Sequence, residues 1–140
     1  MPPSPSRPPG ASPRDPRRLA AELFGRRGEA VAAWYLRAKL YRIVARRLKT
    51  PVGEIDLVAM HLGTLVFVEV KARRRRGDEF DALLHVNRRR LLRAAQYYLL
   101  RNPRLAELPM RFDVIFLAPL TWPRHVRNAF DASRSDFHAA

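Results

Sequence analysis

Cysteine is absent from this 140-residue chain, which excludes both a disulfide framework and a metal site built on thiolate ligands. Long apolar runs are missing as well. The longest, near residues 114–120, is interrupted by Pro119 and is far too short to span a bilayer. The N-terminal residues also lack the apolar segment of a secretory signal peptide. We therefore expect a cytoplasmic protein without membrane-spanning segments.

Acidic residues and lysines are scarce beside the arginines. The 27 basic residues outnumber the 13 acidic ones, which gives a net charge of +14, and only three of the basic residues are lysine. Such an excess favours a polyanionic partner, with nucleic acid ahead of an anionic membrane. We expect nucleic acid, DNA ahead of RNA, and no membrane partner. The arginines expected to contact phosphates form two groups: Arg73, Arg74, Arg75 and Arg76, then Arg88, Arg89, Arg90 and Arg93.

Composition divides the chain into a tail, one domain and an extension. The first 18 residues are rich in proline and arginine and nearly free of large apolar side chains, so we expect them to be disordered. The rest is long enough for one hydrophobic core, which we assign to residues 19–120. Residues 121–140 are expected to form a short irregular extension, with a strand near residues 126–129.

Apolar periodicity predicts the elements of this domain. They are a helix over residues 19–40, a strand over 41–49, a hairpin over 53–71, a second helix over 86–101 and a strand over 110–118. The order α-β-β-β-α-β is typical of a single α/β domain in which helices flank a mixed β-sheet.

The hairpin, GEIDLVAMHLGTLVFVEVK, is the most informative stretch, because charged residues interrupt two apolar, β-prone runs. A short Gly-containing loop over residues 61–64 predicts a turn between antiparallel strands. Met60 then lies opposite Leu65, and alternation puts Ile55, Leu57 and Ala59 on one face. The charged residues share the other face, at the end away from the turn: Glu54, Asp56, Glu69 and Lys71.

In this register Asp56 lies opposite Glu69, and Glu54 lies opposite Lys71. Like charges directly opposite each other destabilise a sheet, and a divalent cation between them would convert that repulsion into binding. Hard cations such as Mg²⁺ take carboxylates, water and substrate phosphates as ligands. The same four residues could instead be solvated charges, with Glu54 and Lys71 forming a cross-strand pair. The register alone leaves both interpretations open.

Five sequence blocks follow one another along the chain: GRRGEAVAAWYL at 25–36, GEIDLVA, LVFVEVKAR, RLLRAAQYYL and RFDVIF. In order and spacing they resemble the YraN family of small bacterial proteins. That family is similar to the PD-(D/E)XK nuclease superfamily, close to the archaeal Holliday-junction resolvases, and the resemblance implies a restriction-endonuclease-like domain.

The resemblance implies roles for particular residues. Asp56 corresponds to the first acid of the motif, and Glu69, Val70 and Lys71 correspond to its (D/E)XK tripeptide. Glu29 corresponds to an additional acid of the resolvase branch. One departure is that relatives commonly carry a lysine near the start of the second helix, where this chain has NRRR at residues 87–90. An arginine there could still contact a phosphate.

The resemblance also implies a metal-dependent nuclease. Asp56, Glu69 and the Val70 carbonyl would hold Mg²⁺ or Mn²⁺, and Glu29 could bind a second metal. Lys71 would orient the attacking water or stabilise charge in the transition state. The expected substrate is nucleic acid, with branched DNA among the candidates, and a four-way junction would call for a homodimer. The alternatives are a catalytically inactive nucleic-acid-binding module and, third, a basic accessory protein of a nucleoprotein particle such as the ribosome.

Overall fold

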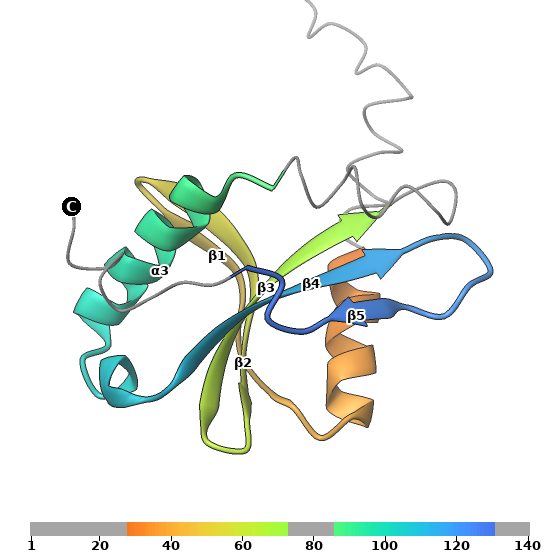
Figure 1. Cartoon of the computed structure of the whole chain (residues 1–140), viewed down its shortest axis with the longest axis horizontal. Coiled ribbons are helices and arrows are strands. Elements are labelled where there is room, and N and C mark those ends of the chain that lie inside the picture. The colour runs from red at the N-terminus through yellow and green to blue at the C-terminus, as the bar shows by residue number, and fades with distance from the viewer. Residues whose placement is uncertain (1–27, 73–85, 131–140) are drawn as a thin grey trace, which may run out of the picture.

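The computed structural model describes residues 28–72 and 86–130 of the chain (Figure 1). Among these residues a helix over 28–38 comes first, and the expected order α-β-β-β-α-β follows, with the short strand β5 after it. The remaining elements are β1 Arg42–Thr50, β2 Gly53–His61, β3 Thr64–Ala72, α3 Arg88–Arg101, a 3₁₀ turn η1 Leu105–Glu107, β4 Met110–Leu117 and β5 Arg124–Val126.

Several expectations fall outside the described residues. They are the disordered tail over residues 1–18, the start of the first helix before residue 28, and the Arg73–Arg76 group. The strand expected near residues 126–129 of the extension lies slightly earlier, as β5 at Arg124–Val126, and Phe130 is buried in the core. No helix within residues 28–72 and 86–130 has the length and apolar character needed to cross a membrane.

The sheet is mixed, as the element order predicts. Its strands lie in the order β1-β2-β3-β4-β5, and only β3 and β4 are parallel neighbours. Parallel strands cannot be joined by a tight turn and need a crossover connection. Helix α3 lies in that connection. The fold is therefore a single α/β domain of the kind expected from the sequence.

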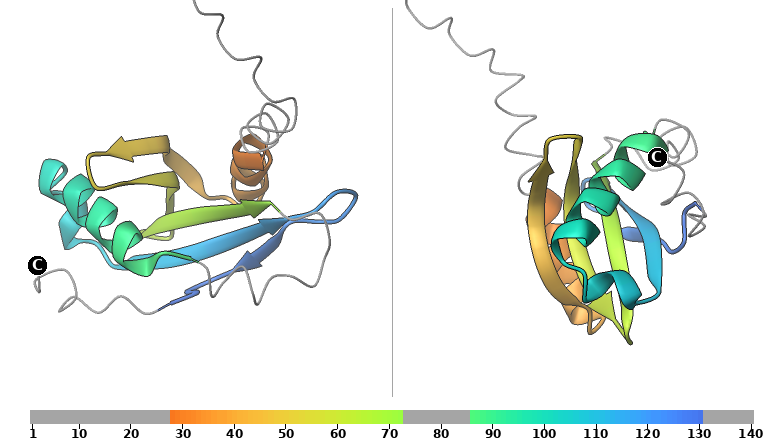
Figure 2. Two further views of the ribbon diagram at one scale, coloured as in Figure 1. Left: turned by 90° about the horizontal axis from the view of Figure 1, so that it is seen from above. Right: turned by 90° about the vertical axis from the view of Figure 1, so that its left-hand side faces the viewer.

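Two helices cover opposite faces of the central strands (Figure 2). On one face the first helix packs Ala32, Ala33 and Leu36 against a cluster that includes Val66 and Val68 of β3. On the other face α3 packs a larger cluster that includes two aromatic side chains of the central strands, Phe67 and Phe112. Strands that are covered on both faces consist almost entirely of apolar residues, which explains why β3 and β4 are so rich in them.

The hairpin register confirms the prediction between the Leu57–Val68 pair and the turn, although the loop is shorter than expected. The pairs expected beyond Leu57, Asp56 with Glu69 and Glu54 with Lys71, are not formed. Met60 pairs with Leu65, and the next pair, His61 with Thr64, belongs to the ladder. Only Leu62 and Gly63 form the turn, both with positive φ, at 49° and 78°. Two-residue hairpins favour this conformation because its twist matches that of the strands.

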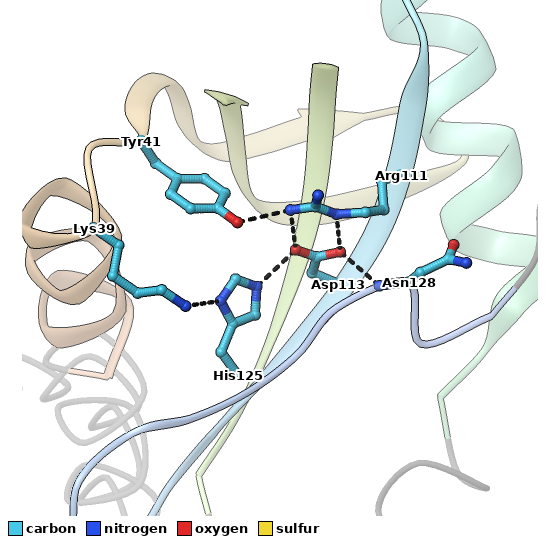
Figure 3. Close-up of polar contacts among 6 residues, drawn as sticks. All are labelled: Lys39, Tyr41, Arg111, Asp113, His125 and Asn128. Atoms are coloured by element: carbon cyan, nitrogen blue, oxygen red, sulfur yellow. Dashed lines mark hydrogen bonds and ion pairs between the residues drawn. The ribbon is translucent and has the colours of Figure 1, made fainter. Parts of the chain in front are cut away.

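A buried ionic network fastens β5 to the rest of the sheet (Figure 3). Arg111 Nε and Nη2 donate to the two oxygens of Asp113, at 2.8 and 2.9 Å, and the Asn128 amide donates to the same carboxylate. His125 Nε2 lies 2.6 Å from Asp113 Oδ2. Burial alone would raise the pKa of Asp113, but these hydrogen bonds outweigh it and the pKa is lowered. Asp113 is therefore a structural charge.

Candidate active site

The two hairpin strands separate where the charged residues lie. The last hydrogen-bonded pair between β2 and β3 is Leu57 with Val68. Beyond it β2 stays paired with β1, and β3 stays paired with β4 (Figure 1). We call the opening between them the fork. Asp56 closes its apex, because Asp56 Oδ2 accepts a hydrogen bond of 2.8 Å from the Val70 amide.

The fork explains a wrong prediction about Ile55. Strict alternation places Ile55 on the same face as Leu57, yet Ile55 packs in the cluster under α3. Once β2 has left β3, it follows β1 and lies against α3. Gly53 permits this approach, since a Cβ at that position would lie 3.2 Å from the Arg90 carbonyl oxygen.

Carboxylates crowd the apex of the fork. Glu29 comes from the helix over residues 28–38, and Glu54 and Asp56 lie two residues apart on β2. One carboxylate oxygen from each lies within 4.8 Å of the others. Because hard cations prefer clustered carboxylate oxygens, this donor set suits Mg²⁺ or Mn²⁺.

Burial and the crowding of the carboxylates raise the pKa of Asp56. Burial is the largest cause and raises the pKa of Asp56 from 3.8 to about 7. The negative charge of Glu69 adds to the rise, the Val70 amide opposes it, and Glu29 contributes further. An acid with this pKa is half-protonated near neutral pH and would be ionised by a bound cation.

Lys71 pairs with a different residue from the one expected. Its Nζ lies 3.2 Å from Glu69 Oε1, so the cross-strand pair with Glu54 is not formed. The two side chains remain 24% and 19% exposed. Lys71 therefore keeps its ammonium group next to the crowded acids and within reach of solvent.

An open cleft of about 320 Å³ lies between the fork and the start of α3. Asn87 caps the helix there, because its side-chain oxygen accepts a hydrogen bond of 3.1 Å from the Arg90 amide. The cleft thus has acids on one wall and a helix N-terminus on the other. Its lining residues are Glu54, Asp56, Glu69, Lys71, Asn87, Arg90 and Leu91.

A smaller cavity of about 100 Å³ borders the other side of Asp56 and is lined by Gly28, Glu29, Val70 and Ala72 together with Asp56 itself. Gly28, in the helix over residues 28–38, lies so close to β4 that a Cβ would lie 3.3 Å from Leu117 Cδ1. This tight contact holds Glu29, the next residue, over the apex. Asp56 therefore lies between the cavity and the cleft.

The family of the chain can be stated once this geometry is known. Residues 28–117 match the family described as "Uncharacterised protein family UPF0102". The chain belongs to this family. A UPF0102 protein of Rhodopseudomonas palustris strain BisB18 is 50% identical over 118 residues, covering 84% of this chain and 87% of that protein. One from Parvibaculum lavamentivorans is 51% identical over 112 residues, covering 80% and 84%. The match to UPF0102 includes the whole fork and ends before β5.

The residues predicted for the site fall into three groups. Asp56, Glu69 and Lys71 meet at the cleft, and Glu29 lies at the apex beside Asp56. Val70 contributes its amide to Asp56, and a role for its carbonyl stays a prediction. Among the predicted phosphate contacts Arg90 lines the cleft, whereas the remaining arginines of α3 are exposed outside its lining: Arg88, Arg89 and Arg93.

Two polar residues of the cleft, and the apolar Leu91, are missing from the sequence prediction. Glu54 is interpreted from the sequence as a partner of Lys71, although its spacing from Asp56 already places the two acids on one face of β2. Asn87 carries no signal beyond its position before a helix, where asparagine is a common cap. Both line the cleft beside the acids.

Proposed function

We propose that this protein is a metal-dependent nuclease that hydrolyses phosphodiester bonds of nucleic acid at the fork. The observation that carries the proposal is the crowding of ionisable acids around Asp56, whose pKa is raised to about 7. Burying unpaired carboxylates destabilises a fold, so such a cluster is understandable if a cation occupies it during function. The cytoplasmic location expected from the sequence stays a prediction.

The carboxylates of Asp56, Glu54 and Glu69 would hold Mg²⁺ or Mn²⁺, because they offer only oxygen donors. A divalent cation there would supply Lewis-acid chemistry, lowering the pKa of water and offsetting negative charge on the phosphate. Lys71 would donate to the attacking water or to the developing charge, since its Nζ lies beside Glu69. The positions of the side chains in the cleft support these roles.

The opposite wall of the cleft suits a phosphate. Helix N-termini attract anions through free backbone amides and the helix dipole. The first turn of α3 contains no acidic residue, and Arg90 lines the cleft beside the cap Asn87. This arrangement favours a substrate phosphate between α3 and the acids. It also supplies an arginine where relatives commonly carry lysine.

The test is a cleavage assay on single-stranded, duplex, flapped and four-way DNA and on RNA, with Mn²⁺, Mg²⁺ or EDTA. We expect metal-dependent cleavage of at least one substrate by the native chain. Lys71→Ala should lower the rate by about 10²–10³, as loss of one transition-state donor does, with little change in affinity. Arg104→Ala, which removes an exposed charge outside the cleft, should change neither quantity.

The competing function is binding without cleavage, which the net charge of +14 favours by itself. In that case no substrate would be cut with either metal, although binding would persist and weaken steeply with salt. Full cleavage by Lys71→Ala would exclude the role proposed for Lys71 and leave the carboxylates as the site. A homodimer and a preference for branched DNA remain proposals to be tested with the same substrates.

A further inference from the structure

Arg47 stands out because its backbone leaves the conformation of the strand around it. Its φ is 49°, within β1, whereas the other non-glycine residues of positive φ among the described residues lie in turns or after a helix: Leu40, Leu62, Leu120 and Asn128. The flanking residues pair with Leu57 and Ile55, so Arg47 lies across from Asp56. A left-handed residue inside a strand is unfavourable for arginine, and such outliers gather at functional sites.

The side chain of Arg47 reaches the acids. Its Nε donates a hydrogen bond to Oε2 of Glu29, and the two form an ion pair. The Glu29 side chain is only 12% exposed, and a carboxylate so far removed from water needs a partner. A guanidinium keeps its positive charge at any pH at which proteins fold. Within the described residues, Arg47 is the cation that forms an ion pair with Glu29.

The ion pairs at the fork show which of its acidic side chains are already neutralised. Four acids of the described residues lie there: Glu29, Glu54, Asp56 and Glu69. Arg47 neutralises the first, and Lys71, with its Nζ 3.2 Å from Glu69, neutralises the last. In the described part of the chain neither Glu54 nor Asp56 forms an ion pair. Among the described residues, these two carboxylates are therefore left to bind one divalent cation, in a cleft that Arg90 also lines.

We propose that Arg47 takes the place of a second metal ion, so that the fork binds a single divalent cation. Arg47 is a positioning residue: it holds Glu29 over the apex and occupies the carboxylate that would otherwise bind a second cation. This inference rests on the proposed function, and it decides between the one-metal and two-metal forms of the site. It also explains why β1 is distorted at Arg47, opposite Asp56.

The experiment counts Mn²⁺ ions bound to the full chain, by calorimetric titration and by the electron paramagnetic resonance signal of free Mn²⁺. We expect one Mn²⁺ for the native chain and two for Arg47→Gln, in which Glu29 has lost its cation. Arg46→Gln is the matched control, because it removes the same charge from the exposed neighbouring residue, and it should bind one. Adding Glu29→Gln to Arg47→Gln should return the count to one.

Two native-chain results would overturn the inference. Two Mn²⁺ ions on the native chain would show that Arg47 does not exclude a second metal, while the proposed nuclease would stand. No binding at all would overturn this inference and the metal-dependent function together. A count of one in a folded Arg47→Gln, checked by circular dichroism, would also overturn the inference.

A second variant keeps the test decisive if Arg47→Gln does not fold. Glu29→Gln should still bind one Mn²⁺, because the remaining ligands lie on β2 and β3. Loss of saturable binding in Glu29→Gln would make Glu29 a direct ligand of the single metal, and would overturn the assignment of Arg47 as its occupant.

Discussion

Replacing Asp56 with asparagine should stabilise the protein in the absence of metal. The pKa of Asp56 is about 7 in the folded chain and 3.8 when unperturbed, and each pKa unit corresponds to about 1.4 kcal/mol. Ionising Asp56 above pH 7 therefore costs the folded state up to about 4 kcal/mol. Asparagine avoids this cost and keeps an oxygen that can accept from the Val70 amide.

The sign of the pH dependence follows from proton counting. Between pH 3.8 and 7 the folded chain holds a proton on Asp56 that the unfolded chain has lost, so the native protein loses stability as pH rises through this range. Asp56→Asn should be more stable than the native chain by up to about 4 kcal/mol at pH 8 and about 2 kcal/mol at pH 5.5. Below about pH 4 the difference should vanish, because both states are then protonated.

The assay is urea denaturation in EDTA at these pH values, repeated with Mg²⁺. A cation at about a hundred times its Kd stabilises the folded state by about 2.7 kcal/mol, and this gain should appear in the native chain and disappear in Asp56→Asn. Glu107→Gln, which removes an exposed carboxylate from η1, should show neither effect. If Asp56→Asn were destabilised at pH 8, or stabilised equally at all pH values, the account of crowded acids would be refuted.

Two further predictions concern the scaffold of the site. Gly53→Ala should lower the free energy of unfolding by about 1–3 kcal/mol, measured by urea denaturation, because the added Cβ would lie 3.0 Å from Arg90 Cγ and 3.2 Å from its carbonyl oxygen. Asp113→Asn should cost about 3–5 kcal/mol by the same measurement, since Arg111 would lose the carboxylate that it contacts with two nitrogens. Unchanged stability in either variant would contradict the contact assigned to it.

The sequence predicts the hairpin register correctly because local patterns specify it. A glycine-containing turn and alternating apolar residues suffice to pair Met60 with Leu65. The fork is different, because it arises from competition between neighbours. Each strand follows its outer partner, β1 or β4, beyond Leu57 and Val68. Since β4 begins at Met110, far along the chain from the end of the hairpin at Ala72, no local pattern reports where the strands separate.

The same reasoning explains which site residues were missed. Arg47 is one arginine in a basic strand, and nothing in the sequence marks its left-handed backbone. Glu54 is visible as a charge, but its partner depends on whether β2 and β3 remain paired. Glu29 enters only through the resemblance to a family, because a single acid on a helix is usually solvated. Long-range packing therefore determines which further residues join the site. The local sequence is enough to predict its central residues Asp56, Glu69 and Lys71.

Asp113 and Asp56 both lie on this sheet, and they differ in their hydrogen-bond partners and in the direction of their pKa shifts. Asp113 accepts hydrogen bonds from Arg111 and from the Asn128 amide and contacts His125, and its pKa is lowered. Asp56 has one backbone donor and three acidic neighbours, and its pKa is raised to about 7. The fold can therefore satisfy a buried carboxylate fully and does so at Asp113. The unmet charge at Asp56 is a cost that stability alone does not explain, and a bound cation would remove it.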